Sequence, residues 1–409
     1  LNASVNHESE ETSLTETLRI SKYIHQIQLF LLEAFKTGRL LEGKSQNVGI
    51  ELPEGISSLP DGQEIVELAL SEFKALLIKV IDLYGYHLEL GEITAVSISD
   101  DRDFGVILCP ASARVGVESR FPNATIFSIT DILFPENIAA PVTPVQAAYI
   151  ERPRKEDAEW FLNYIFRKPE FWSGQWEAVE RSLQGKDSVV LLPTGAGKSI
   201  AFQLSALLLP GRCVVVAPLI SLIQDQGDNL RRYGIERFIG ITSLMTRPEQ
   251  ETALTQFSRG HYLFCYVAPE RFLIPVFVES LRALTVTNPI NIVVIDEAHC
   301  VSEWGHDFRT AYLQIGRNSR EYCESNGQVP PLIALTGTAS KRVLKDVQRE
   351  LDIVDFDAII TPDDFDRKEL NFTILTCDSS EKIGRAVGFI SSLPSKFGVP
   401  ENTFFQSNE

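Results

Sequence analysis

The sequence lacks the features that mark secreted and membrane proteins. Its six cysteines stand singly, with no C-x-x-C pair, which argues against a disulfide framework and a zinc ribbon and fits a reducing compartment. No apolar run approaches the roughly 18–20 residues that a membrane-spanning helix needs. The first residues are acidic and polar, whereas a secretory signal starts basic and continues into an apolar core.

Positive charge is also scarce, since the net charge is −17. Residues 1–150 carry 21 acidic and 10 basic side chains, and residues 151–409 carry 34 and 28. A basic balance would suggest nucleic acid as a partner. Its absence does not exclude one, because a binding groove needs only local positive charge.

The length of 409 residues exceeds the roughly 250–300 at which one hydrophobic core stops growing, so we expect at least two folded units. The acidic first part, residues 1–134, reads as a smaller α+β domain, and the proline-punctuated residues 135–155 read as a linker. In the smaller domain, helical periodicity covers Thr12–Leu40 and Asp61–Tyr84. The strand pattern covers Thr94–Ser99 and Phe104–Cys109.

Residues 156–375 have a different sequence pattern, in which short β-branched runs alternate with helical segments. This alternation predicts an α/β domain, with a parallel sheet covered by helices on both faces. Ligands of such sheets bind at the carboxyl ends of the strands. The expected strands are Val189–Leu192, Cys213–Ala217, Phe238–Thr242, Leu263–Val267, Ile292–Ile295 and Leu332–Leu335.

A glycine-rich loop follows the first of these strands and leads into an apolar helix. Its glycines let the backbone N–H groups turn inward, and the helix N-terminus adds positive dipole, which together favour phosphate binding. Lys198 can reach the outer phosphates and the Ser199 hydroxyl can ligate Mg²⁺. After Pro193, the loop residues predicted to bind nucleotide are Thr194, Gly195, Ala196, Gly197, Lys198 and Ser199.

An acidic pair follows the expected strand Ile292–Ile295. Asp296 would belong to the Mg²⁺ shell, and Glu297 would orient and deprotonate the attacking water. Alone, the pair could be an acidic turn. Together with the phosphate loop it predicts a site that hydrolyses a nucleoside triphosphate, with Lys198, Asp296 and Glu297 as its catalytic residues.

Six segments in order resemble the first motor domain of a superfamily 2 helicase, which implies a RecA-like fold. They are Trp172–Gln175, the phosphate loop, Ala217–Leu222, Tyr266–Arg271, Asp296–His299 and Ala334–Ala339. Directly after Asp296–His299, the segment Cys300–Arg309 resembles the aromatic-rich loop of the RecQ family. The resemblance implies an ATP-driven DNA helicase that uses Mg²⁺, moves 3′-to-5′ on single-stranded or partly duplex DNA and serves DNA repair in the cytoplasm or at a bacterial nucleoid.

The resemblance also implies roles for single residues. Gln175 would read the adenine edge, and His299, Thr336 and Thr338 would couple the ATP site to domain movement. The predicted DNA contacts are Ser221, Gln224, Pro269 and Arg271 on the backbone, and Trp304, His306, Phe308 and Arg309 in the aromatic-rich loop. The alternative for Trp304 and Phe308 is ordinary core packing.

The chain departs from the family pattern at Lys168 and Trp172. RecQ proteins usually show an aromatic residue in the first slot and an arginine in the second, and this chain exchanges them. We expect adenine to lie between the flat ring and the cation with the partners swapped.

A larger departure lies beyond residue 375. Residues 376–409 would be the start of a second helicase domain, with no room for the rest of it or for its arginine fingers, so we expect a fragment with weak ATP turnover. The alternatives are an RNA-acting superfamily 2 helicase and a nucleotide-binding adaptor without motor activity. For the acidic residues 1–134 the readings are a protein-docking module, a mask against non-specific DNA binding and a helical cap on the motor.

Overall fold

The computed structural model describes residues 46–50, 62–85, 90–96, 104–109, 114–128, 148–193, 195–301, 310–362 and 373–400, with a few positions at 24–32 and Arg102. It divides into two compact units, residues 1–363 and residues 364–409. The first unit contains two sheets, a small one near the N-terminus and a larger one that begins after residue 185.

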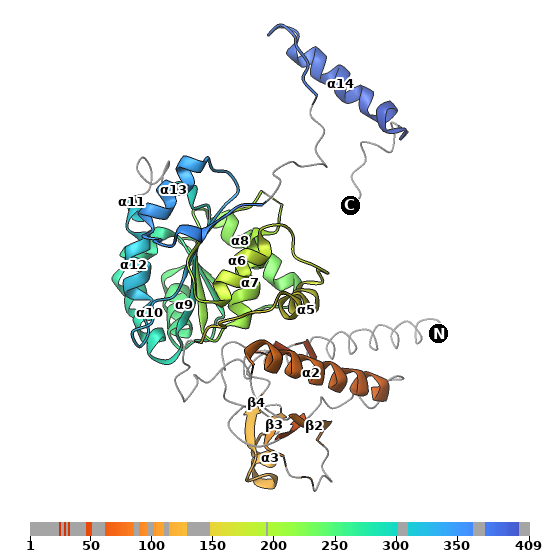
Figure 1. Cartoon of the computed structure of the whole chain (residues 1–409), viewed down its shortest axis with the longest axis vertical. Coiled ribbons are helices and arrows are strands. Elements are labelled where there is room, and N and C mark those ends of the chain that lie inside the picture. Colours follow the sequence, from red (N-terminus) through yellow and green to blue (C-terminus); the bar gives the residue numbers. More distant parts are fainter. Residues whose placement is uncertain are drawn as a thin grey trace. The chain divides into compact units, whose positions relative to one another are not determined.

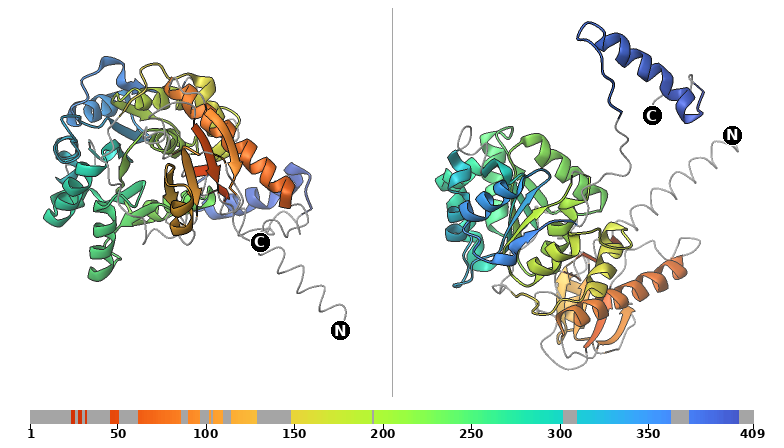
Figure 2. Two further views of the ribbon diagram at one scale, coloured as in Figure 1. Left: turned by 90° about the horizontal axis from the view of Figure 1, so that it is seen from below. Right: turned by 45° about the horizontal axis from the view of Figure 1, so that its top comes forward.

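The small sheet has four described strands in the order β2-β1-β3-β4, and all its pairings are parallel. Helix α2 lies along this sheet (Figure 2). Buried residues of α2 and α5 belong to one continuous apolar core, and Lys79 of α2 pairs at 3.5 Å with the buried Asp157 of α5. These contacts join the small domain to α5. The elements are β1 (Gln46–Ile50), α2 (Gly62–Tyr84), β2 (Leu90–Ala95), β3 (Val106–Cys109), α3 (Arg114–Arg120) and β4 (Thr125–Ser128).

The predicted strand Phe104–Cys109 is confirmed as β3, whereas the prediction of Thr94–Ser99 starts four residues late. Strands β1 and β4 were not predicted. The described positions between 24 and 32 are helical, in agreement with the predicted first helix.

The larger sheet has seven strands in the order β11-β5-β10-β9-β6-β8-β7, all parallel. All six predicted strands are present, each within two residues of its predicted ends. The strands are β5 (Ser188–Leu191), β6 (Arg212–Val216), β7 (Phe238–Ile241), β8 (Phe264–Val267), β9 (Ile290–Ile295), β10 (Leu332–Thr336) and β11 (Ile359–Ile360).

Both faces of this sheet are buried, which explains why its strands are mostly apolar and do not alternate with polar residues; Asn291 within β9 is an exception. Val215 faces one apolar cluster, with α5, α6, α7 and α8, while its neighbours Val214 and Val216 face a second cluster, with α9, α10, α12 and α13. Figure 1 shows the two groups of helices on opposite sides of the sheet. The chain therefore folds as the predicted α/β layers.

Helices α7, α8, α9, α10 and α13 each follow a strand of the sheet within eight residues, so their N-termini lie near its carboxyl edge. The bounds are α5 (Lys155–Phe166), α6 (Gln175–Leu183), α7 (Lys198–Leu208), α8 (Ile220–Arg232), α9 (Arg247–Ser258), α10 (Pro275–Thr287), α11 (Thr310–Leu313), α12 (Ile315–Tyr322) and α13 (Lys341–Glu350), with 3₁₀ turns η3 (Pro269–Leu273) and η5 (Phe356–Ala358).

In the second unit, the described residues form one helix, α14 (Lys382–Phe397), closed by Gly398 in the left-handed conformation. Across the described residues, no helix combines the length and the apolar character needed to span a bilayer. All six cysteines are free thiols, five of them buried.

Candidate active site

Strand order places the predicted nucleotide residues together. The phosphate loop follows β5, Thr336 ends β10 and Asp296 follows β9, and these three strands are neighbours in the sheet. Because parallel strands end at the same edge, residues about a hundred positions apart converge there.

The phosphate loop uses its glycines for backbone shape. Gly195 and Gly197 have φ values of 88° and 66°, a region that side chains other than glycine disfavour, and α7 starts at Lys198. A Cβ added at Gly197 would come within 2.7 Å of the Gln175 side chain. The loop thus needs glycine at 197 for its backbone conformation, and a Cβ there would displace the Gln175 amide.

The acidic pair forms a tight corner at the end of β9. The Glu297 backbone N–H donates to Asp296 Oδ1 at 2.9 Å, and Glu297 itself has a φ of 49°, which is uncommon for a residue with a side chain. Such backbone strain is typical of functional sites, where it fixes the direction of a side chain.

The two carboxyl groups of this corner differ in acidity. Burial, and then the nearby negative charge of Glu297, raise the pKa of Asp296 to about 6. The pKa of Glu297 is lowered instead, first by its hydrogen bond to His299 and also by Lys198. Glu297 is therefore the more readily ionised of the pair, as a base requires.

A chain of polar contacts crosses the site. Lys198 Nζ lies 3.3 Å from Glu297 Oε1, and His299 Nδ1 lies 3.2 Å from Glu297 Oε2. The same His299 nitrogen is 3.0 Å from Thr336 Oγ1, which donates to the Thr338 carbonyl at 3.2 Å. Hydrogen bonding to the Cys300 thiol and then to Glu297 raises the pKa of His299 to about 10. The carboxylate of Glu297 thus lies between two cationic groups.

The donors present fit Mg²⁺. The Ser199 hydroxyl and the Asp296 carboxylate are hard oxygen ligands, and a cation would offset the cost of burying the Asp296 charge. Within the described ranges, no three His, Cys, Asp or Glu side chains gather as a metal-binding group. A Mg²⁺ ion here would therefore depend on substrate phosphates and water for its remaining ligands, as this ion commonly does.

A cleft of about 640 Å³ opens at the same sheet edge, beyond β6, β8 and β7. Ser221 and Arg271 line it, and Arg271 is fixed there by donating to Gln250 Oε1 at 3.1 Å and to the Thr242 carbonyl at 3.0 Å. A cation with a fixed direction and a neighbouring hydroxyl can bind phosphate groups without reading sequence.

Comparison with known proteins identifies the larger domain. A family model for DEAD/DEAH box helicases matches residues 172–347. The probable ATP-dependent DNA helicase RecS of Bacillus subtilis (strain 168) is 36% identical over 233 residues, which are 57% of this chain and 44% of that protein. The ATP-dependent DNA helicase RecQ of Pasteurella multocida (strain Pm70) is 36% identical over 225 residues, which are 55% of this chain and 34% of that protein. This region is therefore similar to DEAD/DEAH box helicases and to the RecS and RecQ helicases, and we call it the RecQ-like domain.

The chain spans less than half the length of these two curated relatives. Among solved structures, the helicase domain of Pyrococcus furiosus Hef aligns with a TM-score of 0.37 and 17% identity, over 49% of this chain and 38% of that chain.

Two predicted adenine contacts of the RecQ-like domain, Gln175 and the Lys168–Trp172 pair, are engaged with other residues of the chain. The Gln175 Oε1 accepts from the Trp172 backbone N–H at 2.9 Å and its Nε2 donates to the Ala196 carbonyl at 2.8 Å, so reading the adenine edge would require the amide to release these bonds. Lys168 Nζ lies directly over the Trp172 ring, 5.9 Å from its centre, so adenine would have to part this pair to lie between them. Gln175 ties the tryptophan-bearing loop to the phosphate loop. Both roles stay predictions.

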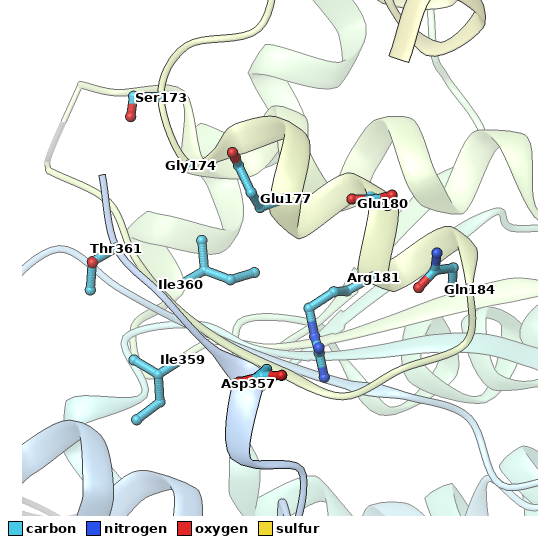
Figure 3. Close-up of a pocket in the computed structure, with 10 residues that line it drawn as sticks. All are labelled: Ser173, Gly174, Glu177, Glu180, Arg181, Gln184, Asp357, Ile359, Ile360 and Thr361. Atoms are coloured by element: carbon cyan, nitrogen blue, oxygen red, sulfur yellow. The ribbon is translucent and has the colours of Figure 1, made fainter. Parts of the chain in front are cut away.

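A second cleft of about 450 Å³ lies beside this loop and includes Ser173 and Gly174 (Figure 3). From α6, Arg181 extends toward the β11 segment, where it pairs with Asp355 and donates to the Asp187 carbonyl. This cation is thus used to anchor the edge strand of the RecQ-like domain.

One predicted DNA contact needs correction. Pro269 is buried at the start of η3, where proline is favoured because an N–H group there would lack a partner in the turn. Its ring is therefore not available to DNA. Gln224 is exposed on α8 but is not among the residues that line the Arg271 cleft. The other predicted nucleic-acid and nucleotide residues Thr194, Trp304, His306, Phe308 and Arg309 lie outside the described residues.

Sequence reasoning missed three supporting side chains of the RecQ-like domain. Gln226 donates to Ser199 Oγ, and Gln203 donates to Gln226. Gln250 holds Arg271. For Gln203, the sequence offered one indication, an amide side chain among the mostly apolar residues of a predicted helix. The residues around Gln226 and Gln250 are mostly polar, so nothing in the sequence distinguishes these two glutamines.

Proposed function

We propose that this chain carries the ATP-hydrolysing domain of an ATP-dependent DNA helicase of the RecQ type, which couples ATP hydrolysis to 3′-to-5′ movement on single-stranded DNA and to duplex unwinding. The hydrogen-bonded series Lys198–Glu297–His299–Thr336 supports this most directly, because it connects the triphosphate residues to the end of a neighbouring strand. The relatives at 36% identity, whose names include ATP-dependent DNA helicase, give the substrate class.

The hydrolytic step follows from the electrostatics of the site. In the absence of nucleotide, Lys198 and Glu297 neutralise each other at 3.3 Å. A triphosphate competes for Lys198, and Glu297, whose pKa is lowered, is then ionised and available to accept a proton from water. Mg²⁺ bound between Ser199 and Asp296 would neutralise charge on the β- and γ-phosphates.

Coupling would pass through His299 and Thr336. His299 contacts the base Glu297 and the strand-end hydroxyl of Thr336, so a change at Glu297 alters the anchoring of residues 336–338.

The nucleic acid would lie along the same edge. Ser221 and Arg271 supply a backbone site there, and Trp304 and Phe308 would add base stacking, which is worth about 1–3 kcal/mol per base. We extend the proposal to a cytoplasmic location, which the free cysteines support. The resemblance to RecQ helicases supports a role in DNA repair, and the acidic charge of the N-terminal domain supports protein partners there.

The test is ATP hydrolysis by the 409-residue chain with and without single-stranded DNA, alongside Lys198→Ala. We expect slow hydrolysis that DNA accelerates and that the variant abolishes.

Other results would redirect the proposal. Acceleration by RNA but not by DNA would indicate an RNA-acting helicase. Nucleotide binding with no hydrolysis, with or without a nucleic acid, would indicate the adaptor.

A further inference from the structure

The Ser199 hydroxyl has a partner on the next helix. Gln226 of α8 donates from Nε2 to Ser199 Oγ at 2.8 Å. Gln203 of α7 donates in turn to Gln226 Oε1 at 3.3 Å. Both ends of the Gln226 amide are therefore satisfied by residues of α7.

This arrangement restricts what the hydroxyl can do. A serine hydroxyl has one hydrogen and two lone pairs. The Gln226 N–H group occupies one lone pair, which leaves the second for a cation and the hydrogen for an acceptor such as a phosphate oxygen. A hydroxyl without the Gln226 donor could rotate freely among these orientations.

The support behind Gln226 is rigid. Gln203 is 2% exposed and lies one helical turn after Ser199, so the two residues are on the same face of α7. Gln226 bridges them from a helix anchored by the buried Ile223 and Leu230. The position of the amide is thus set by packing on both helices.

We propose that Gln226 is a positioning residue that orients the Ser199 hydroxyl for Mg²⁺ and thereby tunes the metal dependence of nucleotide binding. The inference rests on the proposed function, because it requires a magnesium-bound triphosphate at the phosphate loop. Gln226 acts through Ser199 and touches neither metal nor substrate itself.

The test is a titration of the 409-residue chain with a fluorescent ATP analogue at increasing Mg²⁺ and in EDTA. Gln226→Met keeps the length and packing of the side chain but removes the donor, and Gln226→Ala removes both. We expect each to raise the Mg²⁺ concentration for half-maximal binding about fivefold, the ratio for one ordinary hydrogen bond, and to leave binding in EDTA unchanged.

The matched control is Gln348→Ala on α13, which also removes a half-buried glutamine that makes one side-chain hydrogen bond, to the Asp355 carbonyl at 2.8 Å. It should match the wild type. In a Ser199→Ala background, Gln226→Met should have no further effect, since its target is gone.

The outcomes separate the two proposals. If the wild type shows no magnesium-dependent nucleotide binding, the proposed function fails and this inference falls with it. If the wild type binds but Gln226→Met behaves like Gln348→Ala, or still acts when Ser199 is absent, only the inference is overturned. Thermal melting of each variant separates these results from loss of folding.

Discussion

The buried charge of Asp296 should cost the nucleotide-free protein stability, so Asp296→Asn should make it more stable while abolishing ATP hydrolysis. Burial raises the pKa of Asp296 from 3.8 to about 6. A shift of about two units corresponds to roughly 3 kcal/mol of cost at neutral pH. Asparagine keeps the oxygen that accepts from the Glu297 N–H but adds a buried amide, which removes about 1 kcal/mol of the gain.

The expected net gain is about 2 kcal/mol, which raises the melting temperature of a domain of about 200 residues by about 5 °C. The sign depends on pH, because a carboxyl whose pKa is raised on folding costs nothing below its unfolded pKa. The cost grows as the pH rises from 3.8 to about 6 and is constant above that. At pH 5 the cost of the Asp296 carboxyl is about half of that at pH 7.5, so after the amide cost is subtracted the difference between wild type and variant should be about a third of that at pH 7.5.

The assay is calorimetric melting in EDTA without nucleotide at these two pH values. Asp187→Asn is the matched control, because Asp187 pairs with Arg320 at 2.7 Å and accepts the Leu332 N–H at 2.7 Å. The same chemical change there should lower the melting temperature. A destabilised Asp296→Asn protein, or a gain that does not depend on pH, would refute the reasoning.

Three further predictions concern the nucleotide and nucleic-acid residues. Gly197→Ala should weaken binding of a fluorescent ATP analogue at least tenfold, because the φ of 66° disfavours alanine and a Cβ would meet the Gln175 side chain at 2.7 Å. Unchanged binding would contradict the described loop. Trp172→Ala should weaken the same binding severalfold by removing the ring that faces Lys168, and equal affinity would disprove an adenine contact there. Arg271→Ala should weaken single-stranded DNA binding alike for all sequences and lower the slope of log affinity against log salt by about 0.7, which a surface remote from DNA would not do.

The layers of the RecQ-like domain could be predicted because its strands are buried on both faces, as Val214 and Val215 illustrate. Strand β11 escaped prediction because two residues, Ile359 and Ile360, give no periodicity. In the small domain, β2 contains Gly91 and Glu92, which weaken the strand pattern and moved its predicted start.

The acidic pair and the phosphate loop could be placed from sequence because strand ends of a parallel sheet share an edge. The hydrogen-bond partners of Gln175 could not be predicted from sequence, since an amide at the start of a helix can bind a base or a backbone carbonyl equally well. The choice depends on the backbone of residues 195–197, which only the folded loop defines. The role of Gln226 could not be predicted either, because its partner Ser199 lies on a different helix and only the folded chain brings the two together.

The proposed function requires coupling between the triphosphate residues and a nucleic-acid surface on the same sheet edge. The direct measurement is the affinity of the chain for a fluorescent single-stranded oligonucleotide with and without a non-hydrolysable ATP analogue and Mg²⁺, in the wild type and in Lys198→Ala. We predict a severalfold change in DNA affinity that the variant lacks, matched by an equal change in analogue affinity when DNA is present. DNA binding of equal strength in all four conditions would contradict the account.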